Sequence, residues 1–132
     1  MKNFTDYTHK NQYRLIKGQF PPSKRTDVSL LTVIFLMAGN ENFKNEVAKF
    51  VNWIDGVIEW DNMLNEESFN EDIKTMIKLS AELHFDVQMV TISDLITKLD
   101  SKDFSLVLLL LQNIKNGLNF DNYSPTELDS YI

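Results

Sequence analysis

Carboxylates are the side chains with catalytic potential that this sequence supplies at the highest density. Residues 55–72 carry no Lys or Arg but seven acids, which are Asp55, Glu59, Asp61, Glu66, Glu67, Glu71 and Asp72. A pair of carboxylates can hydrolyse a glycosidic bond, and a cluster can bind a divalent cation. The spacing matches no calcium loop, and nothing in it places two carboxylates in one pocket. We therefore predict no catalytic residue, no metal site and no cofactor in this stretch.

Other residue types that carry out catalysis are sparse. The chain has no cysteine, no Gly-x-Ser-x-Gly motif, and four isolated glycines that cannot form a phosphate-binding loop. His9 and His84 lie 75 residues apart in the sequence, and neither has a metal ligand four residues later, as in a His-Glu-x-x-His motif. His84 is expected to be a structural histidine at a helix end. We predict that the protein is not an enzyme; an enzyme built on the carboxylates is the alternative that ranks last.

The acidic stretch does contain residues that suit a binding surface. Tryptophan is favoured at binding hot spots, and complementary charge speeds association and fixes orientation. The sequence therefore predicts a face that binds a protein partner with a basic surface. That face is expected to contain Trp60, Glu59, Asp61, Glu66 and Glu67. The alternative is a solvated acidic surface with no binding role.

Basic residues are concentrated in residues 1–25, which carry six Lys or Arg and one Asp. Lys10, Arg14 and Lys17 are candidates for contacts with nucleic-acid phosphates, and aromatic residues lie between them. The whole chain, however, has a formal net charge of −6 and a pI near 4.8, which repels a polyanion. A nucleic-acid-binding module is therefore the alternative function, and we expect instead a basic helix packed on its own acidic body.

The elements that position these residues are predicted to be mainly helices. The apolar run 28–38 is too short for a membrane span, which needs roughly 20 residues. Asp27 offers an N-cap at its start, Gly39 suits a left-handed residue after a helix, and Asn40 suits the N-cap of the next helix. A helical stripe from Phe43 to Ile54 predicts that this next helix continues until Gly56.

The remaining sequence predicts further helices with local capping signals. Ser68 and Glu71 form the pattern of a capping box, and so do Thr91 and Asp94. Asp100 or Ser101 is expected to cap the last long helix. Residues 57–64 are expected to form a short strand or an irregular segment. The fold class is thus a single, mainly α domain of about five or six helices.

The last long helix is apolar on more than one side. The predicted core stripe is Phe104, Val107, Leu108, Leu111, Ile114 and Leu118. Beside it lie Leu106, Leu109 and Leu110. These three leucines are expected either to be buried within the monomer or to form the face of a homodimer.

Three segments make up the predicted domain. Residues 1–25 hold a basic helix, at about 4–17, and a Pro-Pro linker; residues 26–118 form the helical core; residues 119–132 form a short capped helix or tail. No signal peptide or membrane span is recognised in the sequence, so a cytoplasmic protein is expected, without membrane contacts.

Two stretches, SLLTVIFLMAGNENF (29–43) and DLITKLDSKDFSLVLLLLQNI (94–114), resemble a family of small uncharacterised bacterial and phage proteins, domain of unknown function 6075. The resemblance covers about residues 4–118, and the middle stretch WIDGVIEWDNMLNEE departs from the family pattern. It implies a fold and no activity. The matching positions are Phe4, His9, Gly39-Asn40, Ala81 to Leu83, and Leu99-Asp100 to Phe104.

These observations together favour a small acidic interaction protein that binds and modulates a protein partner. A phage or mobile-element accessory protein that inhibits a host nucleic-acid-handling or defence complex is a natural subclass.

Overall fold

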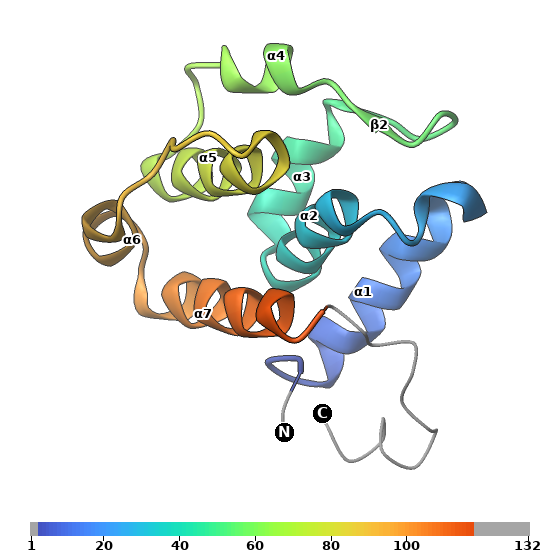
Figure 1. The fold of residues 1–132 in the computed structure, drawn as a ribbon, viewed down its shortest axis with the longest axis horizontal. Coiled ribbons are helices and arrows are strands. Elements are labelled where there is room, and N and C mark those ends of the chain that lie inside the picture. Colours follow the sequence, from blue (N-terminus) through green and yellow to red (C-terminus); the bar gives the residue numbers. More distant parts are fainter. Residues whose placement is uncertain (1–2, 118–132) are drawn as a thin grey trace.

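The computed structural model describes residues 3–117 and confirms a mainly helical fold (Figure 1). In this part of the chain the helices are α1 (Tyr7–Gln19), α2 (Val28–Gly39), α3 (Glu41–Ala48), α4 (Trp60–Leu64), α5 (Glu71–Phe85), α6 (Ile92–Lys98) and α7 (Ser101–Lys115). A 3₁₀ turn, η1 (Pro22–Lys24), joins α1 to α2. The tail helix predicted within residues 119–132, and Leu118, lie outside the described residues.

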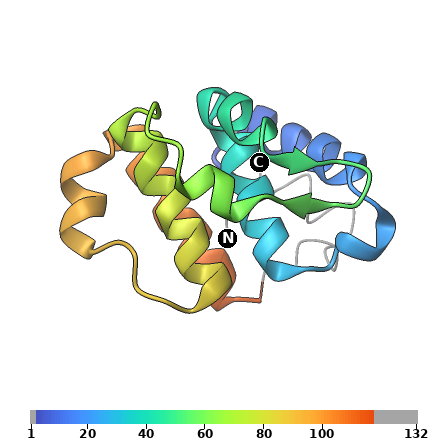
Figure 2. The same cartoon turned by 90° about the horizontal axis from the view of Figure 1, so that it is seen from above.

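A short antiparallel hairpin interrupts the helices. Strands β1 (Val51–Asn52) and β2 (Val57–Ile58) pair so that Val51 is opposite Ile58. Figure 2 shows the hairpin at one edge of the molecule, on the side opposite α6. The expected short strand near residue 57 is therefore present, but it pairs with a segment that was predicted to be helical.

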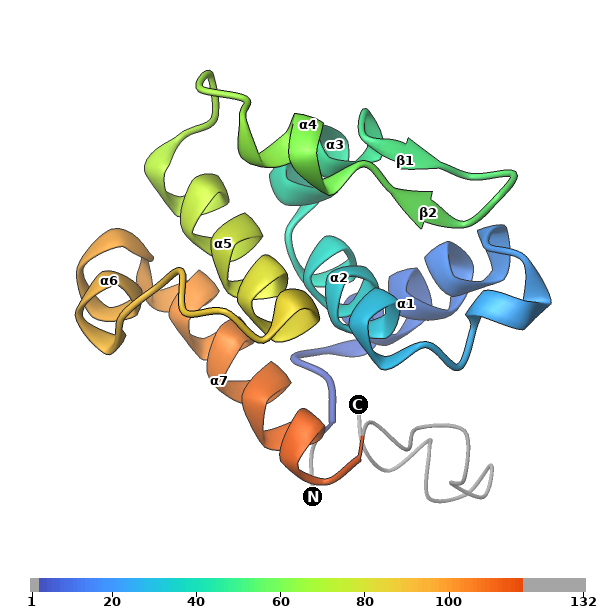
Figure 3. The ribbon, with the colours of Figure 1, turned by 45° about the horizontal axis from the view of Figure 1, so that its top comes forward.

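Helix α2 is the centre of the fold. It packs against α1, α3, α5 and α7 (Figures 1 and 3), and residues 30–37 are all buried. A helix that is apolar on every side is stable in water only when other elements cover every side. This explains why the apolar run 28–38 is a helix of the core. No helix within residues 3–117 combines the length and the apolar character needed to cross a bilayer.

Local capping explains where several helices begin. The Asp27 carboxylate accepts hydrogen bonds from the Ser29 and Leu30 amides, and Thr91 and Asp94 form the reciprocal bonds of a capping box. Asp100 caps α7 by accepting from the Asp103 amide. These three predictions are confirmed.

The capping box predicted at Ser68 and Glu71 is wrong. Helix α5 begins at Glu71, one residue after Asn70 in the N-cap position, and the Asn70 side chain makes no capping bond. Glu71 is thus the first helical residue, where its side chain cannot reach back to cap as it would from the third.

Gly39 has a different role from the one predicted. It is the last residue of α2, and its φ angle is not positive; the following residue, Asn40, is extended and caps α3. A Cβ on Gly39 would overlap the Leu106 side chain of α7. The missing side chain therefore allows α2 and α7 to approach closely, and no left-handed turn is involved.

The long helix predicted from Asn40 to Gly56 is wrong as well. Helix α3 ends at Ala48, and Asn52 starts a turn by accepting hydrogen bonds from the Ile54 and Asp55 amides. Asparagine side chains compete in this way with helical bonding. Gly56 then takes a positive φ of 68°, which glycine adopts at little cost.

The buried stripe of helix α7 only partly matches the predicted one. Val107 is 0% exposed as predicted, and Phe104, Leu111 and Ile114 are half-buried against the core. Leu106 and Leu110 are 1% and 0% exposed, Leu109 is half-buried, and Leu108, predicted for the core, is 49% exposed. The buried positions of α7 are 103, 106, 107, 110 and 113, and two of them, Asp103 and Asn113, are polar. Leu106 and Leu110 therefore belong to the monomer core, which is one of the two expected alternatives, and they are not available for a homodimer face.

Candidate protein-binding face

Trp60, at the start of α4, lies against the last turn of α5. Its ring stacks on His84, with centroids 5.0 Å apart and planes 20° apart, and meets Phe85 edge-on at 5.8 Å. His84 and Phe85 also contact each other edge-on at 4.6 Å. We call these three residues the Trp60 cluster. Helix α5 stops directly after it because Asp86 adopts a left-handed conformation.

The Trp60 cluster is partly open to solvent. Trp60 is half-buried, His84 is exposed, and Phe85 is 46% exposed. Within the described part of the chain, the His84 ring nitrogens make no hydrogen bond. Sequence reasoning placed His84 at a helix end, but it missed the stacking because Trp60 and His84 are brought together only when α4 folds back on α5.

A small hollow of about 150 Å³ lies beside the cluster, which we call the Trp60 hollow. The residues that line it come from η1, the start of α2, β2, α4 and the last turn of α5. Its apolar walls are Leu30, Val57, Ile58 and Trp60, and its polar rim includes Lys24, Asp27 and His84. The hollow has room for one aliphatic side chain.

Two of the predicted carboxylates flank the Trp60 cluster. Glu59 and Asp61 precede and follow Trp60 in the chain, and both are exposed. Among the described residues, no Lys, Arg or His nitrogen lies within 4.0 Å of either carboxylate. Their charges are therefore not neutralised by an ion pair and remain available to an external cation.

Glu66 and Glu67 lie elsewhere. They belong to the connection that leads from α4 to the first turn of α5, whereas Trp60 contacts the last turn of that helix (Figure 3). A 15-residue helix is roughly 22 Å long. The structure therefore groups Trp60 with Glu59 and Asp61, and places Glu66 and Glu67 toward the other end of α5.

The predicted nucleic-acid contact does not form a common surface. Lys10 is only 1% exposed, and its Nζ lies 5.5 Å from the centroid of the Tyr7 ring. Lys17 is half-buried with its Nζ 5.9 Å from the Tyr13 ring, and only Arg14 is exposed. The buried face of α1 includes the stem and amine of Lys10, so a contact of Lys10 with phosphates is contradicted.

His9 is a structural residue of the core. Its Nδ1 accepts a hydrogen bond from the Thr5 amide at 3.0 Å, so in the neutral ring Nε2 carries the hydrogen and donates to the Phe35 carbonyl at 2.9 Å. Burial lowers the pKa of His9 below its usual 6.5, although the bond to Phe35 and the nearby Asp6 oppose this. Both ring nitrogens are engaged, so His9 is not free to exchange a proton with a ligand.

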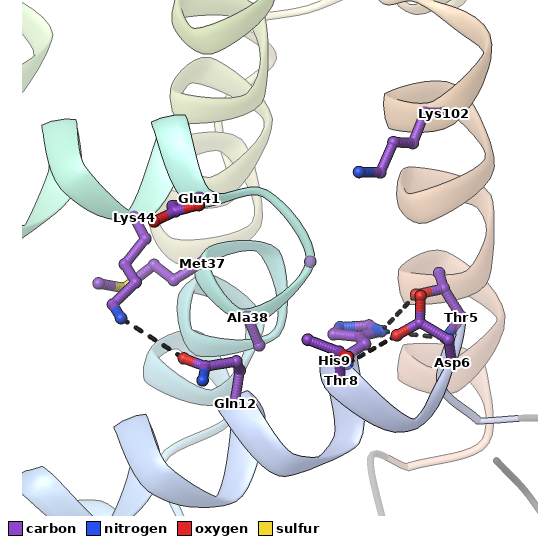
Figure 4. A pocket seen from close by; sticks show the side chains of 11 residues that line it. Thr5, Asp6, Thr8, His9, Gln12, Met37, Ala38, Glu41, Lys44 and Lys102 are labelled. Carbon is purple, nitrogen blue, oxygen red and sulfur yellow. Dashed lines mark hydrogen bonds between the residues drawn. The ribbon is translucent and has the colours of Figure 1, made fainter.

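A cavity of about 350 Å³ adjoins His9 (Figure 4). Lys44 of α3 and Lys102 of α7 lie on opposite sides of it, and Asp6 and Glu41 also line it. Lys44 donates to the Gln12 side chain at 3.4 Å. The cavity is lined by both acidic and basic side chains, and both ring nitrogens of His9 already make hydrogen bonds. Its lining therefore indicates no particular ligand or reaction.

A buried carboxylate joins α7 to the α2–α3 junction. Asp103 accepts a hydrogen bond from the Asn40 side-chain amide at 2.8 Å, while Asn40 also caps α3. Burial raises the pKa of Asp103, and the Asn40 bond partly opposes that shift. Within residues 3–117, no three His, Asp or Glu side chains come together as a group that could hold a metal ion.

Comparison with known proteins gives no relative from which a site could be transferred. No protein-family model matches the chain, and neither a curated protein nor a solved structure matches it. The resemblance stated above therefore remains an expectation, and the functional argument depends on the geometry of the Trp60 cluster, the hollow and the flanking carboxylates.

Proposed function

We propose that the protein is a small acidic interaction module that binds a protein partner with a basic surface. The binding face comprises the Trp60 cluster, the Trp60 hollow, and the carboxylates of Glu59 and Asp61. The observation that carries this proposal is the placement of two carboxylates without ion pairs on either side of a half-buried tryptophan beside a hollow.

The chemistry of the face suits lysine or arginine from the partner. The long aliphatic stems of these side chains pack well on apolar surface while the charged ends stay near water. A stem lying on Trp60 would lie beside residues that adjoin Glu59 and Asp61 in the chain, and a stem in the hollow would have the Asp27 carboxylate at its rim, together with Lys24. Complementary charge of this kind mainly accelerates encounter and fixes orientation.

We also propose where the protein acts in the cell and which process it affects. A cytoplasmic protein is expected, and proteins that handle nucleic acids expose the basic surfaces that this face would bind. We therefore favour a phage or mobile-element accessory protein that inhibits such a host complex, or a host defence complex. Arg14 and Lys17 alone give a nucleic-acid-binding function no comparable support.

The test measures association with a partner captured by the full wild-type chain from cells of the source organism and then purified. The double variant Glu59→Lys/Asp61→Lys should associate roughly tenfold more slowly at low salt, and the rate should depend less on salt. The matched control is Glu66→Lys/Glu67→Lys, which reverses the same number of charges at the other end of α5 and should have a smaller effect. Unchanged kinetics in the Glu59/Asp61 variant would contradict the proposal.

A further inference from the structure

The hairpin between β1 and β2 exposes an apolar side chain at its tip. Ile54 is 87% exposed, more than any other large apolar residue that the structure describes. Figure 3 shows the hairpin at one edge of the molecule, beside the connection from α1 to α2. An isoleucine with this exposure contributes almost nothing to the core, so packing within the monomer does not explain why residue 54 is apolar.

Hydrogen bonds hold the turn in one conformation. The Asn52 side-chain oxygen accepts from the Ile54 and Asp55 amides, each at 3.1 Å, and its side-chain nitrogen donates to the Asp55 carboxylate at 3.1 Å. The Gly56 amide donates to the Asn52 carbonyl at 2.8 Å. The backbone of Ile54 is therefore ordered before any partner arrives.

Contacts with the body fix the turn on both sides of Ile54. The Trp53 ring lies 4.8 Å from the Phe20 ring, centroid to centroid. On the other side, a Cβ on Gly56 would lie 2.7 Å from Cγ of Lys24 and 3.0 Å from Cδ of Pro21, so this backbone lies directly against η1. Ile54 is thus presented outward from a rigid support.

The surroundings of Ile54 indicate the kind of surface that would cover it. Asp55 follows Ile54 in the turn and is exposed, and among the described residues its carboxylate has no basic nitrogen within 4.0 Å. A residue whose backbone is already ordered loses less conformational entropy on binding, which favours its use as an anchor. A carboxylate beside it complements a basic rim.

We infer that Ile54 is an anchor residue that inserts into an apolar pocket with a basic rim on the partner protein. This inference rests on the proposed function and adds a second contact to it. The partner would contribute a cationic side chain to the Trp60 hollow and receive Ile54 in a pocket of its own.

The experiment compares Ile54→Ser with the matched control Ile92→Ser. Ile92 is 76% exposed at the start of α6, on the opposite side of the molecule from the hairpin. With the purified partner, Ile54→Ser should raise the dissociation rate at least tenfold, whereas Ile92→Ser should change it less than twofold. Circular dichroism and thermal unfolding should be the same for both variants and the wild type.

The outcomes separate this inference from the proposed function. If Ile54→Ser binds like the wild type while the Glu59/Asp61 reversal slows association, the anchor is overturned and the proposed face stands. If neither variant changes binding, or the wild-type chain captures no partner, both are overturned. Sedimentation of the wild type and Ile54→Ser tests for a second copy of the chain; an Ile54-dependent dimer would also overturn the anchor.

Discussion

The molecule contains two clusters in which a histidine contacts aromatic rings, and they differ in almost every other respect. In the first, His9 meets Phe35 edge-on at 4.4 Å and Phe4 at 5.3 Å, and all three residues are buried. In the Trp60 cluster, His84 has similar neighbours but is exposed. The first cluster joins α1 to α2, whereas the second lies where α4 meets the end of α5.

The difference shows how the same residue types serve two purposes. The ring nitrogens of His9 are both hydrogen-bonded, which is required of a buried polar group. Among the described residues, the His84 ring nitrogens make no hydrogen bond, and Glu59 and Asp61, which flank Trp60 in the chain, lack ion pairs. The His9 cluster stabilises the fold, and the Trp60 cluster leaves its polar groups available for binding.

Removing one phenylalanine from each cluster should give the largest contrast. Phe35→Ala should lower the free energy of unfolding by about 3–5 kcal/mol, since it opens a cavity beside α1 and removes the ring that His9 contacts. Phe85→Ala should cost less than about 1 kcal/mol, because a half-exposed ring loses less burial. Urea denaturation of the two variants measures both values. Equal losses of unfolding free energy in the two variants would contradict the difference described between the His9 cluster and the Trp60 cluster.

Replacing the histidines should give an intermediate effect with a distinct pH dependence. His9→Gln should cost about 1–3 kcal/mol at pH 7.5, because buried partners lose their hydrogen bonds; His84→Gln should be nearly neutral. Burial lowers the pKa of His9, so below the usual value of 6.5 the unfolded chain binds a proton that the folded chain does not. Stability from this group is therefore present above pH 6.5 and declines as the pH falls through the lowered folded value.

Unfolding measured between pH 7.5 and 5 tests this sign. The wild type should lose stability on acidification, and His9→Gln should lose less. The raised pKa of Asp103 acts in the opposite direction, but it is common to both proteins and cancels in the comparison. A wild-type protein that becomes more stable relative to His9→Gln as the pH falls would contradict the assignment of His9 as a buried neutral ring.

Reversing the charges beside Trp60 should have the smallest effect on folding. Glu59→Lys/Asp61→Lys should change the free energy of unfolding by no more than about 0.5 kcal/mol, because both side chains are exposed and lack ion pairs, and the bond from the Asn62 side chain to Glu59 is long, at 3.4 Å. Thermal unfolding measures the change. A loss above 1 kcal/mol would mean that these carboxylates stabilise the fold, and the two clusters would then be more alike than the structure indicates.

Features set by neighbouring residues could be predicted from the sequence. The caps at Asp27, Asn40, Thr91 and Asp100 depend on side chains that bond to amides two or three residues away. The mainly helical fold follows from many such signals together. The second strand of the hairpin falls where a short strand or irregular segment is predicted. The first strand is not predicted, because the apolar residues after Ala48 also fit a helical period, whereas the Asn52 side chain forms turn bonds instead.

Features set by distant residues could not be predicted. The leucines of α7 surround the helix, so the buried stripe depends on where Asn40 and Gly39 meet Asp103 and Leu106. Of the predicted binding residues, Trp60, Glu59 and Asp61 remain together. His84 and Phe85 entered the site only through the packing of α4 on α5.

One hydrogen bond has a consequence for how the chain acquires its structure. The Asn113 side chain in α7 donates to the Asn3 carbonyl at 2.9 Å, and both residues are buried. Residue 3 therefore reaches its final position only after α7 has formed. Helix α2 is fully covered only when both α1 and α7 pack on it. Long-range contacts of this kind slow folding. During synthesis, we expect the apolar surface of α2 to stay partly exposed until Asn113 has left the ribosome. In this interval the chain should be most prone to aggregate or to bind a chaperone.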